Sequence, residues 1–180
     1  MSVHEDDLAE IARDAGVSAW VHATRLGGPP GEVGLLHTEP VAIASVYKLP
    51  LALVWAGLVE AGELDPRARV RVRREDRVGG PTGIAMLLDD VEMSQRDVVR
   101  LMMAVSDNAA GDAILTLIGL ERVHRGLQDL GLPITLVRHG SADETASIMR
   151  DTGAGSWAAA QVALADPDRT VGTSAPVSSV

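Results

Sequence analysis

The longest apolar run of the chain, from Leu49 to Val59, sets the strongest limit on what the chain can fold into. It lies inside a helix-compatible stretch from about Ser45 to Ala61, which Gly62 ends. A helix that crosses the hydrocarbon core of a bilayer needs about 20 apolar residues, and this run is shorter. The run therefore predicts an apolar helix in a soluble domain rather than a membrane span.

Composition narrows the class of protein and its partners. With 180 residues, 46% of them hydrophobic, the chain is long enough for one globular domain with a sizeable core. It has no Phe, one Tyr and three Trp, so aliphatic side chains and Met have to fill that core. The net charge of −9 argues against nucleic acid or an anionic membrane as a partner, because both attract basic surfaces. The absence of cysteine excludes disulfides and thiolate metal sites.

Hydrophobic periodicity and glycine stops predict the order of helices and strands. A helix around residues 8–15 ends at Gly16, and residues 17–26 and 32–39 form a hairpin around the turn GGPPG. Residues 67–76 alternate Arg with Val, which is typical of a half-exposed strand or an extended loop. Further helices are expected at residues 84–90, 94–105, 108–118 and 121–130, with a weaker one at 155–166. Few strands and many helices indicate an α+β fold.

The two ends of the sequence carry separate expectations. We expect residues 1–165 to form the domain. Residues 166–180 are expected to be a disordered tail, because they are small, polar and without periodicity. The N-terminus MSVHEDDLAEIARD is acidic, whereas a secretory signal begins basic and continues apolar. As written, the sequence predicts a cytoplasmic protein.

Lys48 is the only lysine of the chain, and it stands three residues after Ser45. Residues i and i+3 share a face of a helix, so the amine can reach the serine hydroxyl. A serine is a weak nucleophile until a base takes its proton, and enzymes fit lysine for that task by lowering its pKa to about 7–8. Unpaired N–H groups and the dipole at a helix start favour a developing anion. We interpret Ser45 as a nucleophile and Lys48 as its base, the alternative being a chance spacing.

Asn108 is the only asparagine, and it belongs to the triplet Ser106-Asp107-Asn108 in AVSDNAAG. A structural alternative is that Ser106 or Asp107 caps the helix that follows. The Ser-x-x-Lys and Ser-Asp-Asn motifs nevertheless occur together, in this order, in the active-serine penicillin-recognising enzymes.

On these motifs the chain resembles the N-terminal two-thirds of a class A β-lactamase-type serine hydrolase. The likeness covers roughly residues 3–132: the hairpin, ASVYKLPLALVWAGLVEAGELD, the GGPTGI loop and LMMAVSDNAAGDAILTLIG. It implies a β-lactamase/DD-peptidase-like fold with a helical core beside an antiparallel sheet. It also implies hydrolysis of β-lactams through an acyl-enzyme on Ser45, without a cofactor. Ser106 would relay a proton to the departing lactam nitrogen, and Asn108 would donate to the substrate's side-chain amide.

Two parts of the family's pattern have no counterpart. The Lys-Thr-Gly motif of a later strand is absent, since Lys48 is the only lysine. We therefore expect the C-terminal strands of the sheet to be missing, the activity to be impaired, and the uncovered sheet edge to favour self-association. Class A enzymes also hold a hydrolytic water with a Glu and an Asn. Glu144 in RHGSADETASIM is the candidate for this deacylation base, with a solvated loop carboxylate as the alternative.

The substrate that the resemblance implies is a small-molecule β-lactam or a peptidoglycan-like amide or ester. Without a deacylation base the acyl-enzyme would hydrolyse slowly, as in a penicillin-binding protein. Two further alternatives stay open: a DD-peptidase or esterase relative, and a non-catalytic penicillin-binding-type module. Members of the family are usually exported, which the acidic N-terminus does not predict. The five His residues show no ligand spacing, so no metal site is expected.

Overall fold

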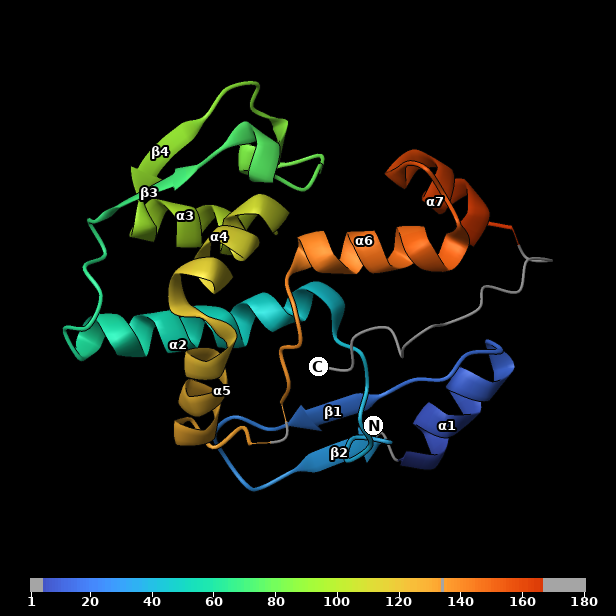
Figure 1. Cartoon of the computed structure of the whole chain (residues 1–180). Coiled ribbons are helices and arrows are strands. Elements are labelled where there is room, and N and C mark those ends of the chain that lie inside the picture. Colours follow the sequence, from blue (N-terminus) through green and yellow to red (C-terminus); the bar gives the residue numbers. More distant parts are fainter. Residues whose placement is uncertain (1–4, 134, 167–180) are drawn as a thin grey trace. The chain divides into compact units, whose positions relative to one another are not determined.

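The computed structural model describes residues 5–133 and 135–166, and it divides into two compact units between Val41 and Ala42. The predicted tail at residues 166–180 lies outside the described residues except for Asp166. Along the described chain, two antiparallel hairpins each follow a helix, and the other α-helices come after the second hairpin (Figure 1), which confirms the α+β prediction. None of the helices within these two ranges is long and apolar enough to span a membrane.

The first unit contains one helix and one hairpin, as the sequence predicts. Helix α1 (Glu5–Asp14) is followed by strands β1 (Val21–Thr24) and β2 (Glu32–Leu35). The strands pair antiparallel, with Val21 opposite Leu35 and Thr24 opposite Glu32. Both strands are shorter than predicted: the paired residues run only from the pair Val21 and Leu35 to the pair Thr24 and Glu32, and Leu36, directly after β2, adopts a positive φ of 51°.

The second unit is built around helix α2 (Lys48–Glu60), which contains the long apolar run. A short 3₁₀ turn, Ala44–Tyr47, leads into it. Helix α2 packs against α3 (Gln95–Ala104), α4 (Asn108–Ile118) and α5 (Leu120–Asp129). The core of this unit is aliphatic, as the composition predicts; its most buried apolar members include Leu51, Ile84, Val98, Ala110, Ile114, Val123 and Leu127.

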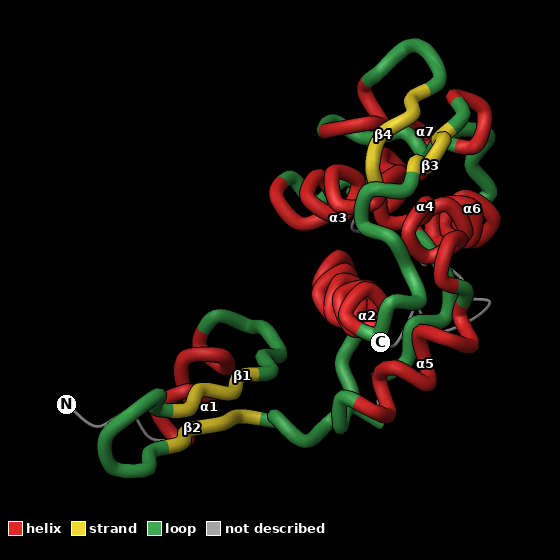
Figure 2. Tube along the Cα trace, turned by 90° about the vertical axis from the view of Figure 1, so that its left-hand side faces the viewer, coloured by secondary structure: helices red, strands yellow, loops and turns green. Residues whose placement is uncertain are grey.

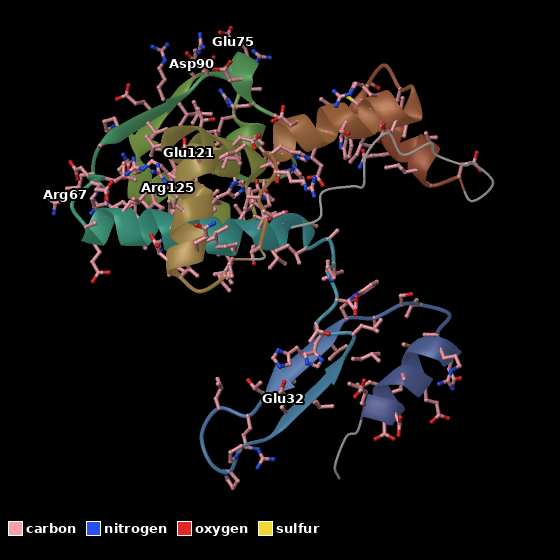
Figure 3. The ribbon with its side chains drawn as sticks, turned by 60° about the horizontal axis from the view of Figure 1, so that its bottom comes forward. Glu32, Arg67, Glu75, Asp90, Glu121 and Arg125 are labelled. Atoms are coloured by element: carbon pink, nitrogen blue, oxygen red, sulfur yellow. The ribbon has the colours of Figure 1, made fainter. Side chains whose placement is uncertain are left out.

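A second antiparallel hairpin covers part of α3 and α4. Strands β3 (Arg69–Val72) and β4 (Val91–Ser94) pair with Val72 opposite Val91, and the hairpin lies against both helices (Figures 1 and 2). The segment in which Arg alternates with Val thus contains a strand, in which Val72 is buried and the arginines are exposed. Arg71 binds Asp90 at 2.7 Å, and Asp90 and Glu75 are among the charged side chains around this hairpin (Figure 3). Strand β4 was not predicted.

The prediction of a helix at residues 84–90 was wrong. Only a 3₁₀ turn, Gly83–Met86, forms there, and Leu87 is extended. The guanidinium of Arg77 explains the difference, because it binds the carbonyl oxygens of Ile84, Leu87 and Asp89. A helix through this segment would direct those carbonyls along its own axis instead.

Two more helices complete the second unit. Helix α6 (Ser141–Thr152) packs against α4 and α7, and helix α7 (Trp157–Leu164) matches the weaker expectation at residues 155–166. Helix α6 was not predicted, so the reading of Glu144 as a loop residue was wrong. Gly153, with a φ of 64°, ends α6.

Candidate active site

Ser45 and Lys48 lie at the point where the 3₁₀ turn becomes helix α2. Ser45 is in the turn and exposed, and Lys48 is the first residue of α2 with only 2% of its surface exposed. Their spacing brings Lys48 Nζ to 3.2 Å from Ser45 Oγ. The structure therefore joins an accessible hydroxyl to a buried amine, as the i and i+3 positions predict.

The Lys48 amine is surrounded by four oxygen atoms. Besides Ser45 Oγ, Lys48 Nζ lies 2.8 Å from the Ser106 carbonyl oxygen, 3.2 Å from Ser106 Oγ and 2.6 Å from Asn108 Oδ1. The carbonyl and the amide oxygen can only accept, whereas the two hydroxyls can donate or accept. A neutral amine has two N–H groups for these obligate acceptors, and its lone pair is then left for a hydroxyl proton. The same cage also suits the ammonium form, so the site accommodates both forms that a general base passes through.

The environment lowers the pKa of Lys48 below its ordinary value. Burial is the largest cause, because desolvation penalises the ammonium form. The carboxylates of Asp112, Asp107 and Glu144 act in the opposite direction. A lowered lysine pKa is what a general base near neutral pH requires.

Strained backbone flanks the amine on both sides. Ser106 has a φ of 54° and Ala44, directly before Ser45, a φ of 43°, and both are left-handed values that non-glycine residues rarely adopt. At Ser106 this conformation allows one residue to direct both its carbonyl and its hydroxyl at Lys48. Such strain collects at functional sites. Sequence reading missed both positions, since neither is glycine or asparagine.

Asp107 anchors the Ser-Asp-Asn motif from inside the protein. It is fully buried, and its carboxylate accepts from Ala110 N at 3.2 Å and from Ile84 N at 2.6 Å. The first bond caps helix α4, as the structural alternative proposed, and the second ties the GGPTGI loop to the motif. A Cβ at Gly83 would collide with this carboxylate, so no side chain fits there. Asp107 therefore fixes the backbone between Ser106 and Asn108.

Tyr47 and Gly111 support the amine from the other side, and neither was predicted. Gly111 on α4 faces both side chains: a Cβ at this position would lie 3.0 Å from Tyr47 Oη and 3.2 Å from Lys48 Cε. Tyr47 is buried and shares a hydrogen bond of 3.2 Å with Ser141 Oγ. Burial raises the pKa of Tyr47 to about 12, so this phenol stays protonated at neutral pH.

Glu144 lies in the first turn of α6 and is half-buried. Among the hydrogen bonds of residues 5–133 and 135–166, none joins its carboxylate to Lys48, Ser45 or Ser106. Its charge acts on the pKa values of Lys48 and Tyr47. The structure thus places Glu144 on an element beside the site, and its role as a deacylation base stays a prediction.

Other candidate sites in the described chain are few. No group of three or more His, Asp or Glu side chains in the described ranges is arranged to hold a metal ion. A cavity of about 250 Å³ lies between β3 and α4, lined by Val70, Arg71, Asp76 and Asp112 among others. Neither serine of the candidate site lines it.

The comparisons with solved structures identify the class of fold. A β-lactamase from Chitinophaga pinensis aligns with a TM-score of 0.69 at 18% identity, over 80% of this chain and 54% of that one. A β-lactamase from Sphaerobacter thermophilus aligns with a TM-score of 0.64 at 21% identity, over 91% of this chain and 68% of that one. A mutant of PBP-A in an acyl-enzyme complex with penicillin G aligns with a TM-score of 0.68 at 18% identity, over 85% and 62%. The fold is that of the class A β-lactamases and related penicillin-binding proteins.

The chain belongs to the beta-lactamase enzyme family, whose model matches residues 4–174. It is also 28% identical over 109 residues to the beta-lactamase regulatory protein BlaB of Streptomyces cacaoi. That match covers 60% of this chain and 35% of the relative, so the chain spans about a third of that protein's length. The predicted family and fold are thereby confirmed.

Proposed function

We propose that this family member is acylated on Ser45 by β-lactams, with Lys48 as the general base. The observation that carries the proposal is the oxygen cage around a buried amine, in which Ser45 Oγ lies 3.2 Å from Lys48 Nζ. The two obligate acceptors occupy the N–H groups of a neutral lysine, so its lone pair faces a hydroxyl. The relative in an acyl-enzyme complex with penicillin G supports a covalent route for this fold.

The proposed acylation step balances within these residues. Lys48 Nζ takes the Ser45 hydroxyl proton while Oγ bonds to the lactam carbonyl carbon, and the carbon–nitrogen bond of the ring then breaks. The ring nitrogen receives a proton through the Ser106 hydroxyl, which lies 3.2 Å from the amine that supplies it. Asn108 Oδ1 accepts a hydrogen bond from Lys48 Nζ, so the side-chain N–H groups of Asn108 remain to donate to the substrate's side-chain carbonyl. The whole substrate stays attached to Ser45, since no fragment leaves when a ring opens.

For the second half of the cycle we propose slow hydrolysis. Glu144 is the candidate base for the attacking water, but no hydrogen bond in the described residues links it to Lys48 or to either serine. A base that is not held against the reacting groups accelerates hydrolysis little. We therefore expect the acyl-enzyme to accumulate, which is the behaviour of a penicillin-binding protein more than of a resistance enzyme.

Intact-mass measurement after incubation with benzylpenicillin tests the acylation. The expected result is an increase by the full mass of the penicillin, lost in Ser45→Ala and retained in Ser156→Ala. Ser156 is the matched control, because it is an exposed serine that caps α7. A folded protein that shows no adduct between pH 6 and pH 10 refutes the proposal. Turnover of a chromogenic cephalosporin compared with a nitrophenyl ester then separates a β-lactamase from an esterase relative.

A further inference from the structure

Asp112 links helix α4 to the start of helix α6. It is half-buried, and its two carboxylate oxygens accept from Ser141 N at 2.6 Å and from Ala142 N at 3.0 Å. Helix α6 has no side-chain cap of its own, so Asp112 supplies the acceptors for its first N–H groups from another helix. Gly140 leaves the space that this contact needs, since a Cβ there would collide with the carboxylate.

The same residues form a closed ring of contacts with the candidate base. The backbone of Ser141 binds Asp112, and its hydroxyl binds Tyr47 Oη at 3.2 Å. Tyr47 directly precedes Lys48 in the chain. Gly111, directly before Asp112, packs on both Tyr47 and the Lys48 methylenes. Two routes of contact therefore connect Asp112 with Lys48, one through Ser141 and Tyr47 and one through Gly111.

Charge couples the two residues as well. The carboxylates that face Lys48 are Asp112 on α4, Asp107 directly before α4 and Glu144 on α6, and Asp112 has the largest effect on the Lys48 pKa among the three. Asp112 itself faces Lys48 and Asp143, and burial raises its pKa while its two backbone hydrogen bonds lower it. Asp107 has a different task, because its oxygens bind Ala110 N and Ile84 N.

We propose that Asp112 is a positioning residue for Lys48, which holds the amine in place through this ring and, by its charge, raises the pH above which Ser45 can be acylated. The inference rests on the proposed function of the Ser45–Lys48 pair. It adds that a residue at the contact between α4 and α6, outside both the Ser-x-x-Lys and the Ser-Asp-Asn motif, influences this pair.

The test compares Asp112→Asn with Asp76→Asn across pH. Asparagine keeps the shape and one acceptor oxygen but removes the charge. Asp76 lines the same cavity as Asp112, yet it is exposed and binds Arg73 at 2.9 Å, outside the ring, so it controls for the loss of any one carboxylate. The rate of adduct formation with benzylpenicillin is followed by intact mass from pH 5 to pH 10. Melting temperatures report whether each variant is folded.

The expected result follows from the sign of the interaction. An anion beside Lys48 favours the ammonium form, so its removal makes the amine neutral at lower pH. The rising limb of the pH profile then moves to lower pH in Asp112→Asn. At the acidic end of this limb, the rate of adduct formation relative to its plateau value rises about threefold or more. The reason is that the rate changes tenfold per pH unit on the limb, so a move of half a unit changes it about threefold. In Asp76→Asn the limb stays where it is. A purely structural role would lower the melting temperature without moving the limb. An unmoved limb in a folded Asp112→Asn overturns the proposal.

A second readout keeps this inference separate from the proposed function. Because Lys48 is the only lysine, selective ¹³C labelling of lysine gives a single side-chain signal whose titration is read directly by NMR. If no variant forms an adduct, the proposed function fails while the titration still tests Asp112. A Lys48 midpoint that falls in Asp112→Asn but not in Asp76→Asn supports the inference. Equal midpoints in all three proteins refute it.

Discussion

Replacing Asp107 by alanine removes two hydrogen bonds that hold the Ser-Asp-Asn motif in place. The first caps α4 through Ala110 N at 3.2 Å, and the loss of such a cap costs about 0.5–2 kcal/mol. The second binds Ile84 N at 2.6 Å in a buried position, and hydrogen bonds to charged groups contribute about 1.5–3 kcal/mol. The two losses share one side chain and are not fully additive. We therefore expect the free energy of unfolding to fall by about 2–4 kcal/mol.

Urea denaturation measures this loss, with Ser156→Ala as the matched control. Ser156 accepts from Ala159 N at 3.2 Å, the same distance as the cap of α4, but it is exposed and this is its one cap bond. At about 2 kcal/mol per molar urea, the middle of the usual range, Asp107→Ala lowers the midpoint by roughly 1–2 M, whereas the control costs about 1 kcal/mol or less. If both variants lose the same stability, the bond to Ile84 contributes nothing and the argument for Asp107 as an anchor is wrong.

Three further changes test the surroundings of the amine. Gly111→Ala forces a methyl group against Tyr47 Oη and Lys48 Cε, so adduct formation should slow at least tenfold, as measured by intact mass against the parent protein. The pKa of Lys48 lies below its ordinary 10.5, so through this residue the unfolded chain binds more protons and stability rises as the pH increases toward 10.5. Tyr47, with a pKa raised to about 12, acts in the opposite direction above about pH 10. Urea titrations below about pH 10 should therefore show the rise in stability lost in Lys48→Met, and an equal rise in this variant would contradict the assignment to Lys48. Ala44→Gly relieves a φ of 43° and should be neutral or stabilise by up to about 1 kcal/mol in the same titration; a clear loss of stability would exclude strain at this position.

The elements that could be predicted are those whose cause lies in their own sequence. Gly16 and Gly62 end helices with φ values of 67° and 73°, because they adopt a conformation that other residues avoid. Ser94 accepts from Asp97 N as the capping pattern predicts. The Ser45–Lys48 contact belongs to the same class, since a spacing of three along a helical segment fixes it.

The elements that were missed have their cause elsewhere in the chain. Helix α6 begins where Asp112, on another helix, accepts its first N–H groups. The segment before β4 is extended because Arg77 binds three of its carbonyl oxygens. The sequence does not indicate which distant backbone groups the side chain of an arginine or an aspartate will bind. The same holds for Gly111, whose missing side chain matters only once α4 packs on Lys48.

No ion pair was predicted, because the composition shows only a net charge of −9. The structure shows individual pairs such as Glu121 and Arg125, one turn apart on α5 with 3.7 Å between their charged atoms (Figure 3). Exposed pairs of this kind contribute about 0.5 kcal/mol or less each, so the error in missing them is small.

The left-handed backbone of Ser106 limits which residues a selection experiment can recover at this position. Threonine keeps the hydroxyl, but it is β-branched and a φ of 54° is a severe outlier for it. Glycine and asparagine accept this backbone but lack the hydroxyl. Ser45 has no such restriction, because it is not among the described residues with positive φ. Mutational tolerance therefore separates the two serines. Threonine can replace Ser45 without backbone strain. At Ser106 the backbone conformation alone excludes threonine, the one substitution that would keep the hydroxyl.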